Sequence, residues 1–334
     1  MTTIVDRNHR APDREPPDRE PLHREPPDRE PLHREPLAYF AAALRGVAQV
    51  GLQPGLPTGA LVLAALWAAG WEVGLPATLG TLVSTAAAYA FGVDRGSVAL
   101  GLQGYSGCLT GIALVGSLGN RPATYLLAAV GCVLCTVLTA ALTALLAPCG
   151  LTALTAPFCL VTGVLLAAVP APAPAPGRMP SGAATGLTAA DLWHAFFANV
   201  AQVFLVDSWY VGLIVLVGLA CADARVVLAA ALGSAVGTAT AWALGAPAGQ
   251  VAAGLHGYDA VLVGIALGAV LLPATPWNAG YALFGAAVST VLAAALTALL
   301  APLGGRPLTW PFVLTTWALL AAVPRLPRLR AAPG

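Results

Sequence analysis

Charged side chains are scarce in this chain, and lysine is absent. Only 9% of its 334 residues are charged, whereas 58% are hydrophobic and the mean hydropathy is +0.78. Residues 1–36 alone hold seven Arg and nine acidic residues, which leaves nine Arg and six acids for the rest of the chain. A soluble domain needs far more charge than this to cover its surface. The net charge of +1 gives no sign of a nucleic-acid partner.

Catalytic and metal-binding motifs are missing as well. The sequence has no Ser/His/Asp set, no HExxH and no phosphate-binding loop. Cys132 and Cys135 form a CxxC inside an apolar segment without a partner pair, which indicates small buried side chains rather than a metal site. His194 and His256 stand alone, and we expect a structural hydrogen bond for His256. The sequence therefore predicts a protein that is not an enzyme and has no cofactor or metal.

Apolar segments long enough to cross the roughly 30 Å hydrocarbon layer recur from residue 37 onward. They predict an all-α polytopic membrane protein with a first transmembrane repeat at 37–169 and a second at 189–323. Residues 1–36 form an Arg/Glu/Pro-rich low-complexity tail that cannot bury a core and is expected to be disordered. Residues 170–188 form a Pro/Ala/Gly linker. The tail at 324–334 carries three Arg residues, so the positive-inside rule places it in the cytoplasm.

The two halves of the apolar region repeat each other. Gly101 to Tyr105 (GLQGY) returns 153 residues later as Gly254 to Tyr258 (GLHGY), and Thr136 to Pro148 returns 154 residues later, with one mismatch, as Thr290 to Pro302. Matched halves that each cross the membrane an odd number of times are inverted, and their shared interface is the usual place for a solute pathway. We predict two inverted repeats of about five transmembrane helices each plus a short pore helix, with both termini on one side.

Two pairs of polar residues recur at matched places in apolar segments. Gln49 and Gln202 must find hydrogen-bond partners or face water, so they act either as contacts between helices or as pore-lining groups for a polar solute. Thr155 and Thr309 each lie two residues before a Pro that would free a carbonyl inside a helix. Their hydroxyls either bond back to the backbone or mark the midpoint of a pore.

The repeated GLxGY motifs add two further sets of candidates. Ser106 and Asp259 follow them and precede short apolar helices, where they are expected to be N-caps of the pore helices. Asp259 is the one acid in such a place, and it is ionised at the helix N-terminus or protonated. Aromatic and aliphatic side chains beside the motifs either line the pore vestibules or pack in the core: Tyr105, Tyr258, Leu109 and Leu262.

These motifs resemble the urea transporter family. The resemblance covers essentially all of residues 37–323 and rests on LRGVAQV at 44–50, GLxGYxxxLxG at 101–111 and 254–264, TxPF in both halves, and VGLIVLVGL at 211–219. It implies an inverted five-plus-five helical fold in the plasma (inner) membrane, a homotrimer, and one pore in each protomer. It also implies passive, channel-like conduction of urea between flat apolar walls, along a ladder of carbonyl oxygens.

The chain departs from the family pattern at two pairs of positions. The family usually has Asn where this chain has Ser106 and Asp259, and Phe where it has Leu52 and Leu205. These changes widen the slot that the solute would enter. They leave open a channel for another small neutral solute, such as a short amide, ammonia or water, and a proton-coupled carrier that uses Asp259.

Overall fold

The computed structural model describes residues 35–169 and 188–329, and within them every regular element is helical. The first half of the chain contains α1 (Glu35–Gln49), α2 (Leu56–Ala69), α3 (Trp71–Ala90), α4 (Arg95–Ala99), α5 (Tyr105–Leu118), α6 (Pro122–Leu146) and α7 (Ala156–Ala168). The predicted tail and linker lie almost wholly outside the described residues. Helix α1 begins two residues before the expected start of the first repeat.

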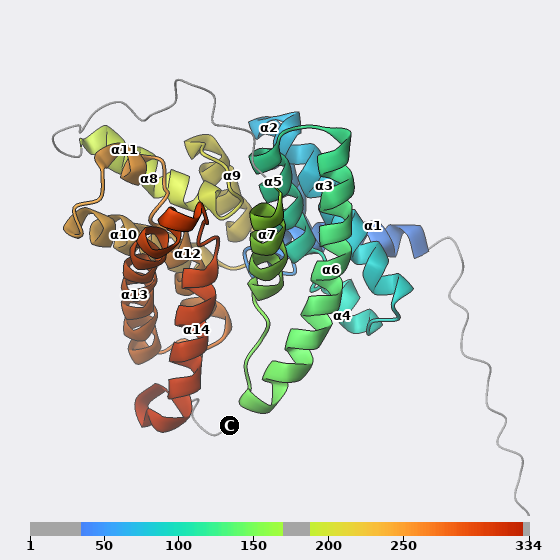
Figure 1. Ribbon diagram of the computed structural model, residues 1–334. Helices are drawn as coiled ribbons and strands as arrows, with labels where there is room; N and C mark the ends of the chain where they lie inside the picture. Colours follow the sequence, from blue (N-terminus) through green and yellow to red (C-terminus); the bar gives the residue numbers. More distant parts are fainter. Residues whose placement is uncertain (1–34, 170–187, 330–334) are drawn as a thin grey trace, which may run out of the picture.

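The second half presents the same series of helices in the same order. It contains α8 (Ala189–Gln202), α9 (Trp209–Ala220), α10 (Ala224–Ala243), α11 (Ala248–Ala252), α12 (Tyr258–Ile265), α13 (Pro276–Leu300) and α14 (Trp310–Ala322). Helices α3 and α10 both have 20 residues, and α6 and α13 both have 25. A π-helical turn, Ala266–Val270, extends α12. Figure 1 shows the two series side by side, blue to green for the first and yellow to red for the second.

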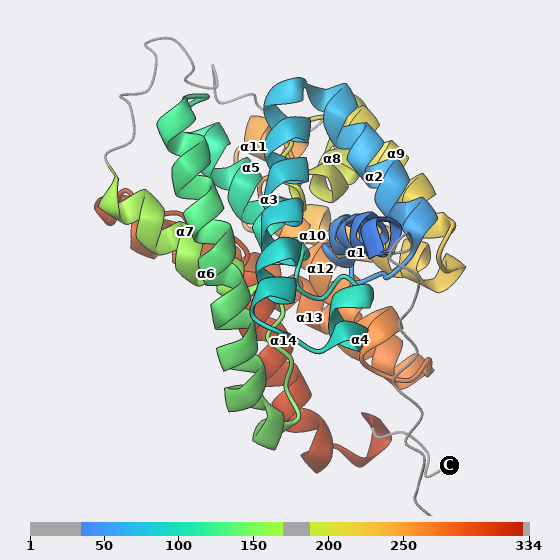
Figure 2. The ribbon, with the colours of Figure 1, turned by 90° about the vertical axis from the view of Figure 1, so that its right-hand side faces the viewer.

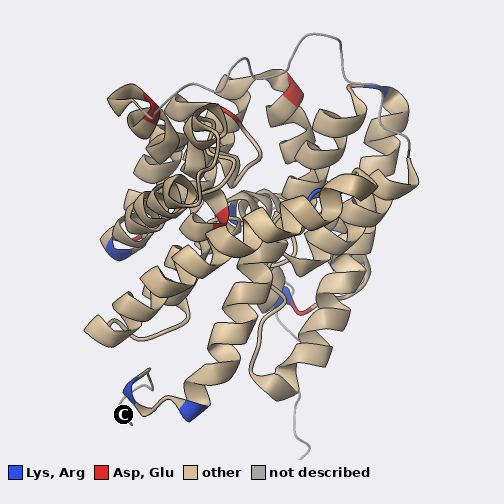
Figure 3. Ribbon diagram, turned by 60° about the vertical axis from the view of Figure 1, so that its left-hand side comes forward, with Lys and Arg blue, Asp and Glu red and all other residues tan. Residues whose placement is uncertain are grey.

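Within residues 35–169 and 188–329, four helical segments are long and apolar enough to cross a membrane: Trp71–Ala90, Pro122–Cys149, Ala224–Ala243 and Pro276–Leu303. Five shorter apolar helices accompany them, among them α5 and α7. Few charged residues interrupt an otherwise uncharged helical body (Figure 3), and two of them, Arg225 and Asp223, form an ion pair at 2.8 Å. These features confirm the predicted helical, membrane-protein character of the chain.

Each series contains two short helices separated by a turn that includes a glycine with positive φ. The segment at 97–117 is split into α4 and α5, and its counterpart at 251–272 is split into α11 and α12. The break follows Gly101 (φ +80°) and Gly254 (φ +74°), a backbone conformation that favours glycine. A Cβ atom on Gly101 would also collide with the backbone of Arg45 in α1, so glycine is needed for this close approach.

Small residues let the helices pack closely, as is common between membrane helices. A Cβ atom on Gly80 of α3 would collide with the carbonyl of Gly107 in α5, and Gly233 of α10 stands in the same relation to Ala260 in α12. The two series meet through α2 and α9, which lie together in Figures 1 and 2. There the Thr58 hydroxyl donates to the carbonyl oxygen of Gly218 at 2.8 Å.

Candidate functional site

A cavity of about 490 Å³ is lined mainly by residues of the first series, with Val270, Leu271 and Phe312 contributed by the second series. Its described lining residues are uncharged and mostly apolar, and its polar groups are amides and hydroxyls. Four of the predicted site residues line it together: Gln49, Leu52, Tyr105 and Thr155. Such a lining offers hydrogen bonds to a polar solute without attracting an ion.

Gln49 and Gln202 make equivalent hydrogen bonds in the two halves. The side-chain nitrogen of Gln49 donates to the carbonyl oxygen of Leu100 at 2.9 Å, and that of Gln202 donates to Ala253 at 3.1 Å. Each bond ties the end of α1 or α8 to the loop that carries the GLxGY motif. Neither side-chain oxygen accepts a hydrogen bond from the part of the chain that the structure describes, and the Gln49 side chain lines the cavity, where its oxygen can accept one from a solute.

Gln103 is a site residue that the sequence reasoning missed. Its side chain lines the cavity and is only 7% exposed, and its oxygen Oε1 has no partner among the described residues. A buried acceptor without a partner is costly, so this oxygen is suited to a donor that arrives with the solute. The sequence feature that could have identified Gln103 is its place within GLQGY, close to the candidates Tyr105 and Ser106.

The two motif tyrosines hold unusual backbone turns in place. The Tyr105 hydroxyl donates to the carbonyl oxygen of Leu154 at 2.6 Å, and the Tyr258 hydroxyl donates to that of Leu308 at 2.7 Å. Leu154 and Leu308 have φ values of +47° and +50°, in the left-handed region that leucine rarely enters. Leu52 and Leu205, at φ +58° and +60°, show the same feature at the ends of α1 and α8.

Thr155 and Thr309 meet where the two series touch. Their hydroxyl oxygens lie 2.6 Å apart, and the Cys159 sulfur lies 3.1 Å from the Thr309 hydroxyl. Pro157 and Pro311 lie in the first turns of α7 and α14, so they break no helix there, and the expectation of a carbonyl freed inside a helix is wrong. Proline is tolerated at that position because the first N–H groups of a helix have no partner within it.

Ser106 and Asp259 do not cap their own helices, which corrects the sequence prediction. The N-cap positions are Gly104 and Gly257, and neither helix has a side-chain cap. Asp259 instead accepts a hydrogen bond from the backbone N–H of Phe312, in the first turn of α14, at 3.1 Å. The cap chemistry is therefore present, but it acts on a helix distant in the sequence.

The remaining predicted residues lie in less exposed places. Leu109 and Leu262 are each 1% exposed and belong to the hydrophobic core that includes Phe158 and Phe312.

A second hollow of about 320 Å³ lies beside the carbonyl to which Gln202 donates, and its lining includes Ala253 and His194. His256 forms a contact with the side chain of Gln250 at 3.1 Å, in keeping with the expected structural hydrogen bond.

A duplicated apolar helix bundle around an uncharged, amide- and hydroxyl-lined cavity defines a membrane transport protein of the kind that handles polar, uncharged solutes. The chain belongs to the urea transporter family, whose model matches residues 40–324. Proteins named urea transporter 1 from Ovis aries and Rattus norvegicus are each 29% identical to this chain, over 87% of its length and 78% of theirs. The protein of that name from Mus musculus is 28% identical over the same shares.

Proposed function

We propose that the chain is a passive urea channel in which the solute passes from the cavity through the point where Thr155 and Thr309 meet. One observation carries the proposal: Thr155 lines the uncharged cavity, and its hydroxyl oxygen lies 2.6 Å from that of Thr309 in the second series. Urea has N–H donors and a carbonyl acceptor, and threonine hydroxyls can serve both. The departures at Leu52 and Leu205 leave room for a planar solute in this proposal.

The arrangement lowers the cost of crossing for a neutral amide. Stripping water from a polar molecule is unfavourable unless fixed groups replace the lost hydrogen bonds. The acceptors that would do so are the side-chain oxygens of Gln49, Gln103 and Gln202, with the two threonine hydroxyls between them. In the proposal Tyr105 and Tyr258 position the loops beside the vestibules, and Leu109 and Leu262, which lie in the core, support these loops from behind. Because urea carries no charge, its passage needs no coupled ion.

The proposed architecture is a pair of inverted repeats, 37–169 and 189–323. Thr155 and Thr309 are matched residues that touch each other, which supports a two-fold axis passing between them. An axis of this kind in the membrane plane inverts one half relative to the other. With five crossings in each half, both termini lie in the cytoplasm, on the side favoured by Arg325 and Arg328. We also infer a homotrimer in the plasma (inner) membrane, with one pore in each protomer.

A proton-coupled carrier is the weaker alternative. Asp259 is fully buried, and one of its oxygens is engaged by the Phe312 N–H. It is absent from the lining of both hollows described above. The carboxyl therefore acts in the proposal as a contact between helices.

Stopped-flow light scattering on proteoliposomes tests the proposal. Vesicles containing the purified protein are challenged with urea, acetamide, glycerol or water, with and without a proton gradient. We expect fast urea flux that rises linearly with urea concentration and is the same with and without the proton gradient. Flux for a different solute only would overturn urea as the substrate, and flux that requires the gradient would overturn the passive mechanism.

A further inference from the structure

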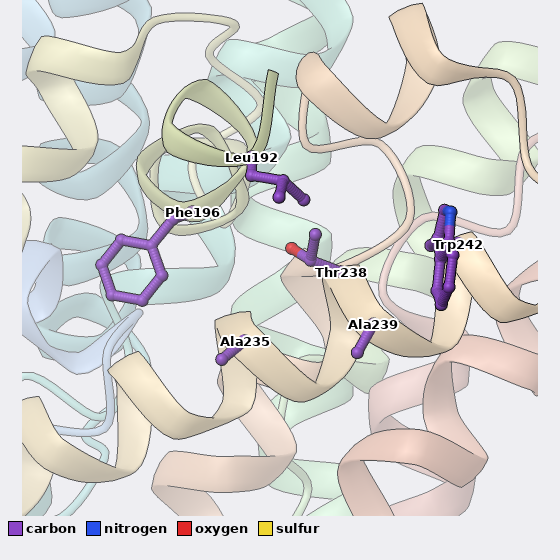
Figure 4. A pocket seen from close by; sticks show the side chains of 6 residues that line it. All are labelled: Leu192, Phe196, Ala235, Thr238, Ala239 and Trp242. Atoms are coloured by element: carbon purple, nitrogen blue, oxygen red, sulfur yellow. The ribbon is translucent and has the colours of Figure 1, made fainter. Parts of the chain in front are cut away.

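An open groove lies on the outer side of α8 and α10, and none of its lining residues lines the cavity that contains Gln49 and Thr155. Its volume is about 490 Å³. Figure 4 shows Phe196 and Ala235 at one end and Trp242 at the other, with Leu192 facing Thr238 between them. Leu192 is 47% exposed and Trp242 is 65% exposed, so the groove is a surface feature rather than a closed void.

At the equivalent surface of the first series, the side chain of Tyr39 bridges α1 and α3. At the offset of 153, Leu192 corresponds to Tyr39 and Ala235 corresponds to Leu82. The Tyr39 hydroxyl donates to the carbonyl oxygen of Leu82 at 2.7 Å, and the Tyr39 ring lies 6.0 Å from the ring of Tyr89. The second series has the smaller Leu192 and Ala235 at these positions, and both line the groove.

The lining of the groove matches hydrocarbon. None of its described lining residues is charged. Its one hydroxyl group, on Thr238, accepts a hydrogen bond from the Asn199 side chain at 2.9 Å and so has a partner already. Apolar surface is stabilised when it is removed from water. Because the phase around a membrane-spanning helix is lipid, the surface of this groove would be covered by hydrocarbon.

The direction of the groove agrees with that of a lipid chain. Helix α10 is one of the four segments long enough to cross a membrane, and Trp242 lies one residue before its end. Tryptophan is enriched at the level of the lipid head groups. From Trp242 back to Ala235 the groove covers seven residues, roughly 10 Å of helix, and so runs from the interface into the hydrocarbon layer, whose full thickness is about 30 Å.

We propose that this groove, lined by Leu192, Phe196, Ala235, Thr238, Ala239 and Trp242, is a specific binding site for one lipid acyl chain. The chain enters at Trp242 and lies over Thr238 and Ala239. The side chains of Phe196 and Ala235 end the site. We expect no such site in the first series, because the Tyr39 side chain crosses the equivalent surface to the carbonyl oxygen of Leu82. The proposal depends on membrane residence and not on which solute the pore conducts.

Photo-crosslinking in lipid nanodiscs tests the site. The full chain is reconstituted with phosphatidylcholine that carries a diazirine in the middle of one acyl chain, and the adducts are mapped by peptide mass spectrometry. We expect adducts concentrated on 235–242 and few on the equivalent stretch 82–89. The double variant Leu192→Tyr with Ala235→Leu restores the first-series residues and should lose the adducts. Leu228→Tyr, at an exposed position of α10 outside the groove, should keep them.

A second variant guards against a folding defect. Ala239→Phe changes one exposed alanine and should also lose the adducts while urea flux in proteoliposomes stays at the wild-type level. Equal labelling of 82–89 and 235–242 would overturn the proposal. Labelling of 235–242 that is unchanged in the double variant and in Ala239→Phe, whose larger side chains occupy the groove, would overturn it as well. Crosslinks from a photoreactive residue at position 192 to a second copy of the chain would overturn it too, since that result assigns the groove to a subunit contact.

Discussion

Replacing Thr309 by valine removes one hydroxyl from the meeting point of the two series and changes little else in shape. The Thr309 side chain is 1% exposed and is the shared neighbour of the Thr155 hydroxyl at 2.6 Å and the Cys159 sulfur at 3.1 Å. Thr309→Val therefore leaves the Thr155 hydroxyl and the Cys159 sulfur without the Thr309 hydroxyl as a hydrogen-bond partner. Thr155→Val leaves Thr309 in contact with Cys159, so we expect it to be the milder change.

The size of the effect follows from the cost of an unpaired buried group, about 1–3 kcal/mol. If urea bonds to these hydroxyls as it passes, this cost is added to the barrier at the midpoint. Because each 1.36 kcal/mol changes a rate tenfold, urea flux should fall by between about fivefold and about 150-fold. Thr309→Ser, which keeps the hydroxyl, should retain flux near the wild-type value.

Thr316→Val is the matched control. Thr316 lies two turns further along α14, is fully buried, and its hydroxyl has no partner among the described residues. The same chemical change there breaks no hydrogen bond, so flux and melting temperature should hold or rise. Wild-type urea flux in both Thr309→Val and Thr155→Val, measured by stopped-flow on proteoliposomes of equal protein content, would refute the role of the pair.

Three further predictions concern the supports of the site. Asp259→Asn keeps an acceptor for the Phe312 N–H and should preserve urea flux, whereas Asp259→Leu should cost about 1–3 kcal/mol and lower the melting temperature in detergent; loss of flux in the Asn variant would contradict this role. Leu205 has φ +60°, so Leu205→Gly should be more stable than Leu205→Ala by about 1 kcal/mol, and the reverse order would show that no strain is present. The Asp94 side chain accepts a hydrogen bond from the Ser97 N–H, which lowers the pKa of Asp94 in the folded protein. This hydrogen bond stabilises α4 fully above the unfolded-state pKa of about 3.9, and the stabilisation is lost as the pH falls through the folded-state pKa. Urea flux measured by stopped-flow should therefore be constant from about pH 5 to 8.

The helices were predictable because the apolar pattern and the breakers agree. Pro122 and Pro276 stand at the first positions of α6 and α13, where proline fits. Gly101 and Gly254 lie in the turns between α4 and α5 and between α11 and α12, where a positive φ favours glycine. Local propensity and global fold therefore point the same way at these places, which is the condition under which sequence reasoning succeeds.

The partners of the site residues were less predictable, because they come from distant parts of the chain. Asp259 looks like the cap of the helix that it begins, since capping is a local pattern. Its actual partner, the Phe312 N–H, is 53 residues away and is brought near only by the packing of α12 against α14. The left-handed leucines are still harder to foresee, because leucine disfavours that conformation.

The one place where the repeats differ in length shows how an insertion can shape a site. The offset between the halves is 153 at Leu109 and Leu262 but 154 from Thr136 onward, so one residue was gained between. The π-helical turn Ala266–Val270 lies in that interval, whereas α5 is α-helical throughout. A π turn accommodates one additional residue within a helix and is often found at functional sites. Val270 and the next residue line the same cavity as Gln49 and Thr155, so the stretch in which the repeats differ in length contributes a wall from the second half to that cavity.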